Sequence, residues 1–482
     1  MEFPGRHPFL NNKVYVKWIC LCRYRKGTEG MKSKTIKLIT LFMVTGLLIT
    51  STVGCGGQKQ SVVESNENQN IEQTMEESSI EETDTEGSDA QEATSENSES
   101  QTEDGESQAE SQNEEIVADT SNENNGESTE QIEEETEMID RSRTFELLSK
   151  MNVGWNLGNT LDAHGAGNSL NSETYWGNPK TTKEMVDAIK AQGINTIRIP
   201  VTWAEHVGSA PDYTINEEWL DRVQEVVDYA VANDMYIIID THHEPDFWLT
   251  PKEDKMDDVK AQLGAIWKQV AERFKDYDEK LLFEGMNEPR NKGTAQEWNG
   301  GTTAEQALID ELNAVFVDAV RSTGGNNEER VLIICAYGNT ANSGALKHLV
   351  IPKDPNIAVA VHLYTPYVFT YEASSGNIDT WSGNKTSEIE IAAKMVDKFL
   401  IQNGVPAIVT EFGAVNKGNS EEVIKWLGDY MGAMNEYGIK CIWWDNNIYD
   451  KNGEKFGIFD RQNLSWYDQA IADALVQNAI TE

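Results

Sequence analysis

Between Arg141 and the end of the chain, short apolar runs alternate with longer amphipathic runs. The short runs have the length and β-branched content of buried strands, and the long runs repeat apolar residues with helical periodicity. Eight strands that alternate with helices predict an α/β fold of the (β/α)8 or TIM barrel type. The predicted strands are residues 153–157, 195–199, 236–240, 281–284, 331–335, 358–362, 407–410 and 441–444.

The amphipathic runs predict the helices that cover such a barrel. The link between the fifth and sixth strands is the weakest part of the pattern, because it has room for only a short helix around Ala345. The other predicted helices are residues 183–192, 217–233, 257–275, 303–322, 387–402, 421–437 and 467–476.

The residues before the predicted barrel have a different composition. The whole chain has a net charge of −41, and residues 56–140 alone hold 28 Asp and Glu, one Lys and no aromatic side chain. Such a segment cannot bury enough apolar surface to offset the entropy lost on ordering. We therefore expect residues 56–140 to be a disordered acidic linker and residues 141–482 to form one folded domain.

Residues 31–55 have the pattern of a signal peptide. Three lysines precede an apolar run over residues 38–49, which is too short for a comfortable membrane span. The small residues before Cys55 resemble a bacterial lipobox, although Thr52 stands where that pattern usually has Leu. The resemblance implies a lipid on Cys55 that anchors an extracellular protein to the outer face of the bacterial cell membrane. The alternative is plain secretion. Residues 1–30 would then be an upstream extension without a fold.

The charge and the cysteines narrow the range of partners. An acidic chain repels phosphate backbones, so nucleic acid is not an expected partner. The five cysteines do not make a disulfide framework, and Cys335 and Cys441, which close predicted strands, are expected to be small buried thiols. We expect no cofactor and no bound metal, and a monomeric protein.

Two apolar strands are each followed at once by a polar turn that carries a carboxylate. Glu288 ends the run LLFEGMNE at residues 281–288, and Glu411 follows the run PAIVT at residues 406–410. The C-terminal ends of barrel strands meet on one face, so the two side chains are expected to lie close together. Paired carboxylates hydrolyse glycosidic bonds, one as acid/base and the other as nucleophile or base.

Seven short motifs in chain order make this interpretation more specific. They are GWNLGN (154–159), RIP (198–200), THHE (241–244), MNEP (286–289), HLY (362–364), TEFG (410–413) and WWDN (443–446). From about Met151 onward the chain resembles glycoside hydrolase family 5, in the branch that includes cellulases, lichenases and xyloglucanases. The resemblance implies an endo-β-1,4-glucanase that cleaves cellulose, mixed-linkage β-glucan or xyloglucan with retention of configuration.

The resemblance also implies a division of labour between the two carboxylates. Glu288 is expected to be the general acid/base and Glu411 the nucleophile of a double displacement, with the carboxyl groups about 5–5.5 Å apart. Glu288 must carry a proton to act as an acid, so its pKa should be raised. Glu411 needs a lowered pKa, and Arg198 is the natural cation to supply it.

Supporting roles around the cleaved bond follow from the same resemblance. Asn287 is expected to bond the sugar 2-hydroxyl, and His242 to contact the sugar at the cleaved bond. His362 and Tyr364, two residues apart on one face of a strand, are expected beside the carboxylates, with the Tyr364 hydroxyl holding the nucleophile. Trp444 is expected to lie under the sugar, because an indole stacks on the apolar face of a pyranose.

Other residues are expected farther along the cleft. The asparagines and the histidine belong to motifs that the resemblance assigns to the non-reducing side, and each tryptophan stands in a predicted loop, where it is either a sugar platform or a loop anchor. His243 and Trp443 alternate away from their neighbours and are expected to be structural. The candidates for outer subsites are Asn156, Asn159, His164, Trp176, Trp248 and Trp381.

Three other functions fit parts of this pattern. A β-mannanase of the same family acts on a sugar that differs at the 2-hydroxyl, and no residue pattern here distinguishes the two substrates. A non-catalytic surface glucan-binding lipoprotein would keep the cleft, although such proteins usually lose one carboxylate. A metal-dependent barrel hydrolase would draw its ligands from Asp240, His242, His243, Glu244 and His362, but adjacent histidines on a strand face opposite ways.

Overall fold

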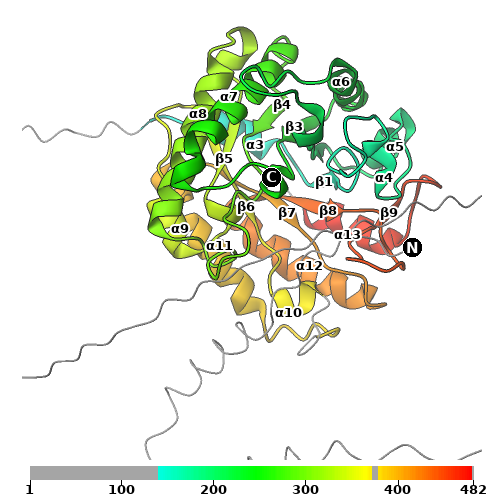
Figure 1. The fold of residues 1–482 in the computed structure, drawn as a ribbon. Helices are drawn as coiled ribbons and strands as arrows, with labels where there is room; N and C mark the ends of the chain where they lie inside the picture. The colour runs from blue at the N-terminus through cyan, green and yellow to red at the C-terminus, as the bar shows by residue number, and fades with distance from the viewer. Residues whose placement is uncertain (1–138, 372–377, 480–482) are drawn as a thin grey trace, which may run out of the picture. The chain divides into compact units, whose positions relative to one another are not determined.

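The computed structural model describes residues 139–371 and 378–479, so the expected signal peptide, Cys55 and most of the acidic linker lie outside the described residues. Eight parallel strands form a closed barrel in chain order, and helices surround it (Figure 1). This confirms the (β/α)8 barrel expected from the sequence. The strands are β1 (Gly154–Leu157), β2 (Thr196–Ile199), β3 (Tyr236–Asp240), β4 (Leu281–Glu284), β5 (Leu332–Cys335), β6 (Ile357–His362), β7 (Ala407–Phe412) and β8 (Lys440–Asp445).

All the predicted helices are present, with ends that differ from the predicted ones by at most three residues. The main helices are α5 (Lys183–Ala191), α6 (Glu217–Val231), α7 (Met256–Arg273), α8 (Thr303–Arg321), α9 (Ser343–His348), α11 (Thr386–Phe399), α12 (Ser420–Asn435) and α13 (Gln469–Asn478). None of the described helices is both long enough and apolar enough to cross a membrane.

Several short elements were not expected from the sequence. The short α-helices and the small hairpin are α3 (Ser142–Ser149), α4 (Ser172–Tyr175), α10 (Tyr367–Thr370), β9 (Phe459–Asp460) and β10 (Ser465–Trp466). The 3₁₀ turns are η1 (Ala204–His206), η2 (Glu244–Asp246), η3 (Glu253–Lys255), η4 (Gly325–Glu328), η5 (Tyr337–Asn339) and η6 (Ile401–Asn403). Most of them lie in the loops after the strands.

Side-chain caps determine where several outer helices begin. The Thr302 side chain accepts from the Glu305 backbone N–H while the Glu305 carboxylate accepts from the Thr302 N–H, which is a capping box at the start of α8. Asn216 and Asp468 cap α6 and α13 with their side-chain oxygens. The long loop between β4 and α8, which carries Glu288, therefore ends at a well-defined point.

Alternate residues of each strand face two different layers. One set packs outward against the helices in a large apolar core that includes Ile197, Phe283 and Trp267. The other set points into the barrel, where Ile238 and Leu282 belong to a smaller apolar core. Farther along the same inward positions, toward the C-terminal ends of the strands, the buried interior is polar and contains Asn156, Arg198, Asp240, Glu284 and Thr410.

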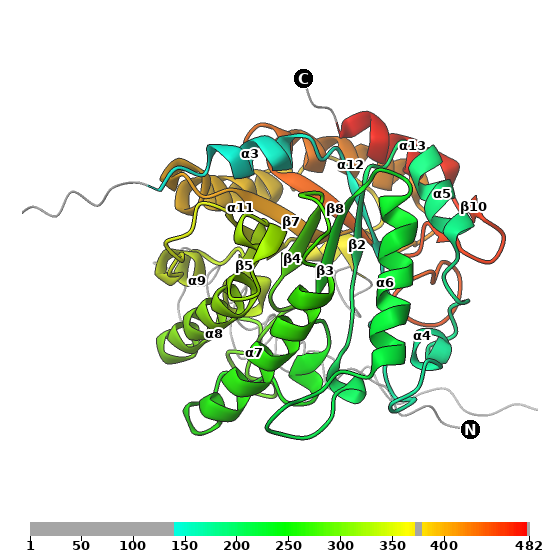
Figure 2. The ribbon, with the colours of Figure 1, turned by 90° about the horizontal axis from the view of Figure 1, so that it is seen from above.

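α3 closes the N-terminal end of the barrel (Figure 2). Its Leu147 and Leu148 are buried in the same apolar cluster as the inward-facing strand residues. The Thr144 hydroxyl donates to the Pro355 carbonyl just before β6, which holds the helix in place. The helix is only eight residues long and lies at the edge of the acidic region, so it did not stand out as a separate element in the sequence.

We predict that residues before Ile139 are dispensable for folding but that α3 is not. Removal of residues 1–138 should leave a soluble domain with an unchanged melting temperature, whereas removal of residues 1–151 exposes the base of the barrel core and should give insoluble or strongly destabilised protein. Leu148→Ala in the full chain should cost roughly 2–5 kcal/mol of unfolding free energy. Calorimetry of both truncations and of this variant measures these effects.

The exposed Ser149 on the same helix provides the matched control. Ser149→Ala should leave the melting temperature unchanged. Equal melting temperatures for Leu148→Ala and Ser149→Ala would contradict the role assigned to α3.

Candidate active site

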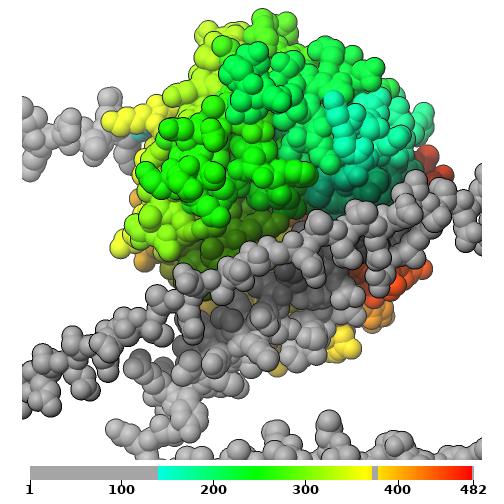
Figure 3. Space-filling model, in the orientation of Figure 1, coloured from blue at the N-terminus to red at the C-terminus, as the bar shows by residue number. Residues whose placement is uncertain are grey.

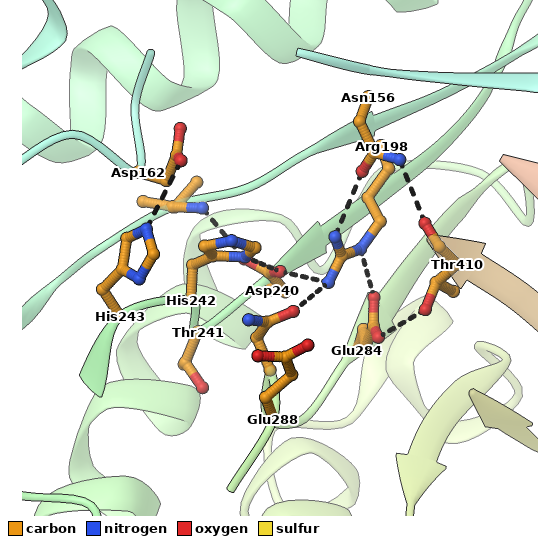
Figure 4. A network of polar contacts seen from close by, with 12 residues as sticks. Asn156, Asp162, Arg198, Asp240, Thr241, His242, His243, Glu284, Glu288 and Thr410 are labelled. Atoms are coloured by element: carbon orange, nitrogen blue, oxygen red, sulfur yellow. Dashed lines mark hydrogen bonds and ion pairs between the residues drawn. The ribbon is translucent and has the colours of Figure 1, made fainter. Parts of the chain in front are cut away.

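Arg198 stands at the centre of a buried polar network inside the barrel (Figure 4). Its side chain is completely buried, and each of its five N–H donors has an acceptor within hydrogen-bond distance. The acceptors are Glu284 (2.6 Å from Nε), Asn156 and Glu411 (3.1 and 2.8 Å from Nη1), and Asn287 and Asp240 (2.8 and 2.7 Å from Nη2). The guanidinium therefore connects five different strands or strand ends.

The network neutralises charge that burial would otherwise make costly. Burial alone would lower the pKa of Arg198, but the carboxylates of Glu284, Asp240 and Glu411 outweigh it and raise that pKa. Glu284 is bonded further by the Thr410 hydroxyl at 3.1 Å. Arg198 pairs with Glu411, as expected, and it also pairs with Asp240 and Glu284 in the interior of the barrel.

A β-bulge in β7 places Glu411 in this network. Val361 of β6 pairs with Val409, and the next residue, His362, pairs with Glu411, so β7 contains one extra residue at this point. Normally adjacent strand residues face opposite sides, but here the Thr410 hydroxyl and the Glu411 carboxylate both reach the interior network. The bulge therefore lets one strand supply two neighbouring groups to the site.

One cationic donor and one neutral donor hold the Glu411 carboxylate. Its Oε1 lies 2.8 Å from Nη1 of Arg198, and its Oε2 accepts a hydrogen bond of 2.9 Å from the Tyr364 hydroxyl. Burial, with Glu411 as the nearest charge, raises the pKa of Tyr364 well above its usual value, so the hydroxyl keeps its proton and donates. The contact between Tyr364 and Glu411 is the one that the sequence motifs led us to expect.

Glu288 lies in a strained turn just beyond β4. Its φ of 46° is in the left-handed region, which costs a non-glycine residue about 1–3 kcal/mol. Two side chains hold the turn: Asn339 Oδ1 accepts from the Glu288 N–H at 2.8 Å, and Arg290 Nη1 donates to the Glu288 carbonyl at 2.9 Å. The strain aims the carboxylate across the face of the barrel toward β6 and β7.

The Glu288 and Glu411 carboxylates meet at His362. Nδ1 of His362 lies 2.9 Å from Oε1 of Glu288 and 3.5 Å from Oε2 of Glu411. One oxygen of each carboxylate lies within 4.8 Å of the other. The structure therefore brings together the two glutamates, Arg198, Asn287, His362 and Tyr364.

The electrostatics of Glu288 differ from the expectation. Burial would raise its pKa, but the hydrogen bond with His362 and the nearby charge of Arg290 outweigh burial and lower the pKa to about 2. In the ligand-free protein Glu288 is thus ionised, whereas a raised pKa was expected. The hydrogen bond with His362 contributes most to this lowering, and Arg290, which the sequence reasoning passed over, adds to it from 3.4 Å away from Oε2 of Glu288.

His242 and Trp444 form a parallel pair beside the network. Their ring centroids are 5.6 Å apart, and the angle between the two ring planes is 4°. Nδ1 of His242 lies 2.7 Å from Asp240. Burial would lower the pKa of His242, but the Asp240 carboxylate raises it to about 9. Trp443, in contrast, is completely buried in the core, as expected.

A second group of rings comes from the loops after β1 and β3. Two of its members, Trp176 and Phe247, are called the aromatic wall below. His164 contacts Trp176, His243 and Phe247 with ring centroids 5.0–5.4 Å apart. Trp176 and Phe247 are among the most exposed large apolar side chains of the described residues. In Figure 3 the teal surface of the β1 loop adjoins the green surface of the loops after β3 and β4. His243, expected to point away from its neighbour, instead packs edge-on against His242 at 4.6 Å.

Of the candidates for outer subsites, Asn156 and Trp381 are buried and have structural roles instead, whereas Trp248 is only partly buried. Asn156 is completely buried, and its amide donates to the Thr410 carbonyl while its oxygen accepts from Arg198. Trp381 is 5% exposed, with its indole N–H on Asp429. Trp248 packs partly against the main core, so the exposed aromatic of its loop is Phe247.

Asn159 lies between the exposed and the buried candidates for outer subsites. It is half-buried, with φ of 57°. Its backbone N–H donates to Asp162 and its carbonyl accepts from Asn178, so it shapes the loop after β1. Cys335 and Cys441 are buried free thiols, as expected.

The proposed ligands of a metal-dependent hydrolase do not converge. Asp240 is bound by Arg198 and His242, and Glu244 Oε1 accepts from the Trp203 backbone N–H in a fully buried position. Within the described ranges, His362 falls in a different group of nearby donors from His242. The arrangement gives no single site that joins those five residues at the catalytic pair.

Several members of the site were not predicted as functional residues. Asp240 and Glu284 end β3 and β4 at inward-facing positions, so the two-residue strand period contained a signal for them. Arg290 follows the MNEP motif directly, and its guanidinium lies 4.2 Å over the ring of the exposed Trp298. No sequence signal indicated that Asn339, from the loop after β5, would hold the Glu288 turn.

Comparisons with known proteins agree with this geometry. The family model described as cellulase, glycosyl hydrolase family 5, matches residues 161–450. Endoglucanase A of Ruminococcus albus is 48% identical over 343 residues, which cover 70% of this chain and 92% of that protein. A xyloglucan-specific endo-β-1,4-glucanase from a metagenomic library, solved in complex with cellotriose, is 57% identical with a TM-score of 0.69 and covers 70% of this chain and 99% of its own.

A lichenase of the same family from Caldicellulosiruptor sp. F32 is also similar. It is 39% identical with a TM-score of 0.67, and the match covers 71% of this chain and 96% of that chain. The family model spans more than half of this chain and includes both Glu288 and Glu411. The chain therefore belongs to glycoside hydrolase family 5, the cellulase family.

Proposed function

We propose that this protein is an endo-acting, retaining β-1,4-glucanase in which Glu288 is the acid/base and Glu411 the nucleophile. The observation that carries the proposal is the proximity of the two carboxylates, whose nearest oxygens lie within 4.8 Å. Retaining glycosidases hold their carboxyl groups about 5–5.5 Å apart, whereas inverting ones leave about 6.5–9.5 Å for a water molecule. The short separation supports the retaining arrangement.

The first step transfers the sugar to the enzyme. A Glu411 oxygen attacks the anomeric carbon while Glu288 gives a proton to the glycosidic oxygen, the bond between that carbon and oxygen breaks, and the shortened glucan leaves with a new hydroxyl. In the second step Glu288 takes a proton from water, the water oxygen attacks the anomeric carbon, and the Glu411 carboxylate is released. Two inversions at one carbon give net retention.

Glu411 is suited to the nucleophilic role because donors hold both of its carboxylate oxygens in place. Arg198 and the Tyr364 hydroxyl bind one oxygen each, and both donors are held by the surrounding structure. Arg198 makes four hydrogen bonds and an ion pair with Asp240, so it cannot rotate away without breaking several contacts. Nucleophile and cation are thus positioned before substrate arrives.

Glu288 is suited to the acid/base role because it can exchange a proton with its surroundings. Its side chain is 21% exposed, whereas that of Glu411 is 7% exposed. In the ligand-free state His362 and Arg290 stabilise its anion. The proton for the first step must therefore be taken up as the substrate excludes water from the site, which strengthens repulsion between the two carboxylates and favours their sharing one proton.

The remaining groups fit a glucan chain. The Asn287 amide nitrogen is left for the sugar 2-hydroxyl, because its oxygen accepts from Arg198. Trp444 and His242 supply the surface under the sugar, and Trp176 and Phe247 extend the aromatic surface along the wall. We assign the wall to the non-reducing side of the cleaved bond.

The preferred polymer is proposed from the relatives. The similar proteins are named as endoglucanase, xyloglucan-specific endo-β-1,4-glucanase and lichenase. These names refer to enzymes whose glucan substrates contain β-1,4 bonds. We propose cellulose, mixed-linkage glucan and xyloglucan as substrates, with β-mannan as the competing possibility. A non-catalytic glucan-binding role is disfavoured because both carboxylates are present.

Export and attachment of a lipid at Cys55 are proposals from the sequence alone, because those residues lie outside the described part of the chain. Incorporation of labelled fatty acid that depends on Cys55 is the observation that would decide between an anchored and a freely secreted enzyme.

Glu288→Gln and Glu411→Gln should each lower kcat by at least about 10²-fold, because each removes a group that takes part in bond breaking. Circular dichroism should show an unchanged fold. For the wild type, NMR should show the β-anomer as the first product. A variant with more than a tenth of wild-type activity, or an α-anomer as first product, would contradict the assigned roles.

Arg290→Met should move the alkaline limb of the pH–rate profile to higher pH. The Arg290 charge lowers the pKa of Glu288, so its removal raises that pKa and keeps the acid form present to higher pH. Arg290→Lys keeps the charge and should leave the limb closer to its wild-type position. An unchanged or downward-shifted limb in Arg290→Met would show that Arg290 does not influence the acid/base.

A substrate panel tests the proposed specificity. Carboxymethylcellulose, barley β-glucan and xyloglucan should be hydrolysed, with early loss of viscosity that indicates internal cleavage. Xylan and β-mannan should react much more slowly. Preferential hydrolysis of β-mannan would support the mannanase alternative, and the absence of turnover on every polymer would support a binding role.

A further inference from the structure

Two of the histidines in the described part of the chain have no hydrogen bond to their rings. His206, His242, His348 and His362 each have one ring nitrogen bonded to a side-chain oxygen. The rings of His164 and His243 have none within the described residues, and Nε2 of His243 is buried without a partner. Buried polar atoms are nearly always bonded, so an orphaned ring nitrogen points to a missing partner such as a water or an ion.

The two rings lie edge to face, and each has a carboxylate nearby. Their centroids are 5.4 Å apart. Nε2 of His164 lies 3.7 Å from Oδ2 of Asp246, and Nε2 of His243 lies 3.6 Å from Oδ2 of Asp162. These distances are too long for hydrogen bonds. The 3.7 Å between His164 and Asp246 is close to the separation of about 3.3–3.4 Å between neighbouring ligands of a tetrahedral ion whose bonds are about 2.0–2.1 Å.

Three of these side chains converge on one point. One donor atom each from His164, His243 and Asp246 lies within 4.8 Å of the other two. They come from two different loops, the one after β1 and the one after β3, so the convergence arises from the fold rather than from sequence adjacency.

The charged groups around the two rings both favour and oppose a bound cation. The Asp246 carboxylate provides negative charge, and Asp162 places a second carboxylate beside the His243 ring. Lys292, which pairs with the other Asp246 oxygen, opposes a bound cation.

We propose that His164, His243 and Asp246 form a binding site for a divalent transition-metal ion such as Zn²⁺. Two imidazole nitrogens and one carboxylate oxygen suit Zn²⁺, Co²⁺, Ni²⁺ or Cu²⁺ better than Mg²⁺ or Ca²⁺, which take oxygen ligands. The partly exposed position leaves at least one coordination site to water. The site shares no residue with the Glu288–Glu411 pair, so the ion is not a participant in the hydrolysis.

The location gives the ion an inhibitory role. His164 is in contact with Trp176 and Phe247, which form the aromatic wall assigned above to the glucan. A hydrated cation there occupies space that a pyranose ring would need, so metal and substrate exclude each other. This inhibitory role rests on the proposed function, whereas the binding site itself does not.

Direct metal binding tests the site without reference to activity. The full chain, without an affinity tag and with Cys20, Cys22 and Cys55 replaced by Ser in every sample, is titrated with Zn²⁺ by calorimetry and with Co²⁺ by visible absorption. The parent should bind one equivalent through this site. His164→Ala and Asp246→Asn should weaken that equivalent by at least about tenfold. Lys292→Gln removes a competing cation and should tighten it.

The exposed His348, which is absent from the groups of converging metal donors, is the matched control. His348→Ala should leave the affinity unchanged, and circular dichroism should show that each variant is folded. Equal affinities for the parent, His164→Ala and Asp246→Asn would overturn the proposal. So would loss of binding only in His348→Ala.

A separate assay addresses inhibition. Zn²⁺ should raise the KM for a soluble β-glucan with little change in kcat, and excess chelator should restore activity. Asp246→Asn should be less sensitive to Zn²⁺ than the parent. Binding without inhibition would retain the site and overturn its position on the substrate path, and absence of any glucan hydrolysis would count against the proposed function while leaving the metal titration valid.

Discussion

The site depends on one buried guanidinium. Arg198 is completely buried and makes four hydrogen bonds and an ion pair with Asp240, so it fixes the positions of Glu411, of Asn287 and of two further carboxylates at once. Such a cation is stable inside the barrel only because it is surrounded by acceptors, and the carboxylates are stable there only because of the cation. Stability of the polar interior and preorganisation of the site are therefore the same interaction.

Two local irregularities supply the carboxylates to this scaffold. The bulge in β7 brings Glu411 inward next to Thr410, and the left-handed turn after β4 turns Glu288 toward it. A regular barrel would present neither group in this way. The strain at Glu288 is balanced by Asn339 and Arg290, which come from the loop after β5 and from the same turn.

The fold and the pair of glutamates could be predicted because strand length, helical periodicity and strand-end motifs are local properties of the sequence. The predictions failed where the role of a residue depends on contacts between segments that are far apart in the sequence. Asn156 lies in a family motif but is consumed by Arg198 and the Thr410 carbonyl, and Trp381 is fixed by Asp429 on another helix. The lowered pKa of Glu288 likewise depends on how the fold places His362 and Arg290 around it.

The position of α3 also determines on which side of the barrel the chain enters the domain. Ile139 and Asp140 lead into a helix that covers the N-terminal end of the barrel, while Glu288 and Glu411 lie at the C-terminal ends of the strands. The described chain thus enters the domain on the side opposite Glu288 and Glu411, and its point of entry lies away from the face that carries the two carboxylates.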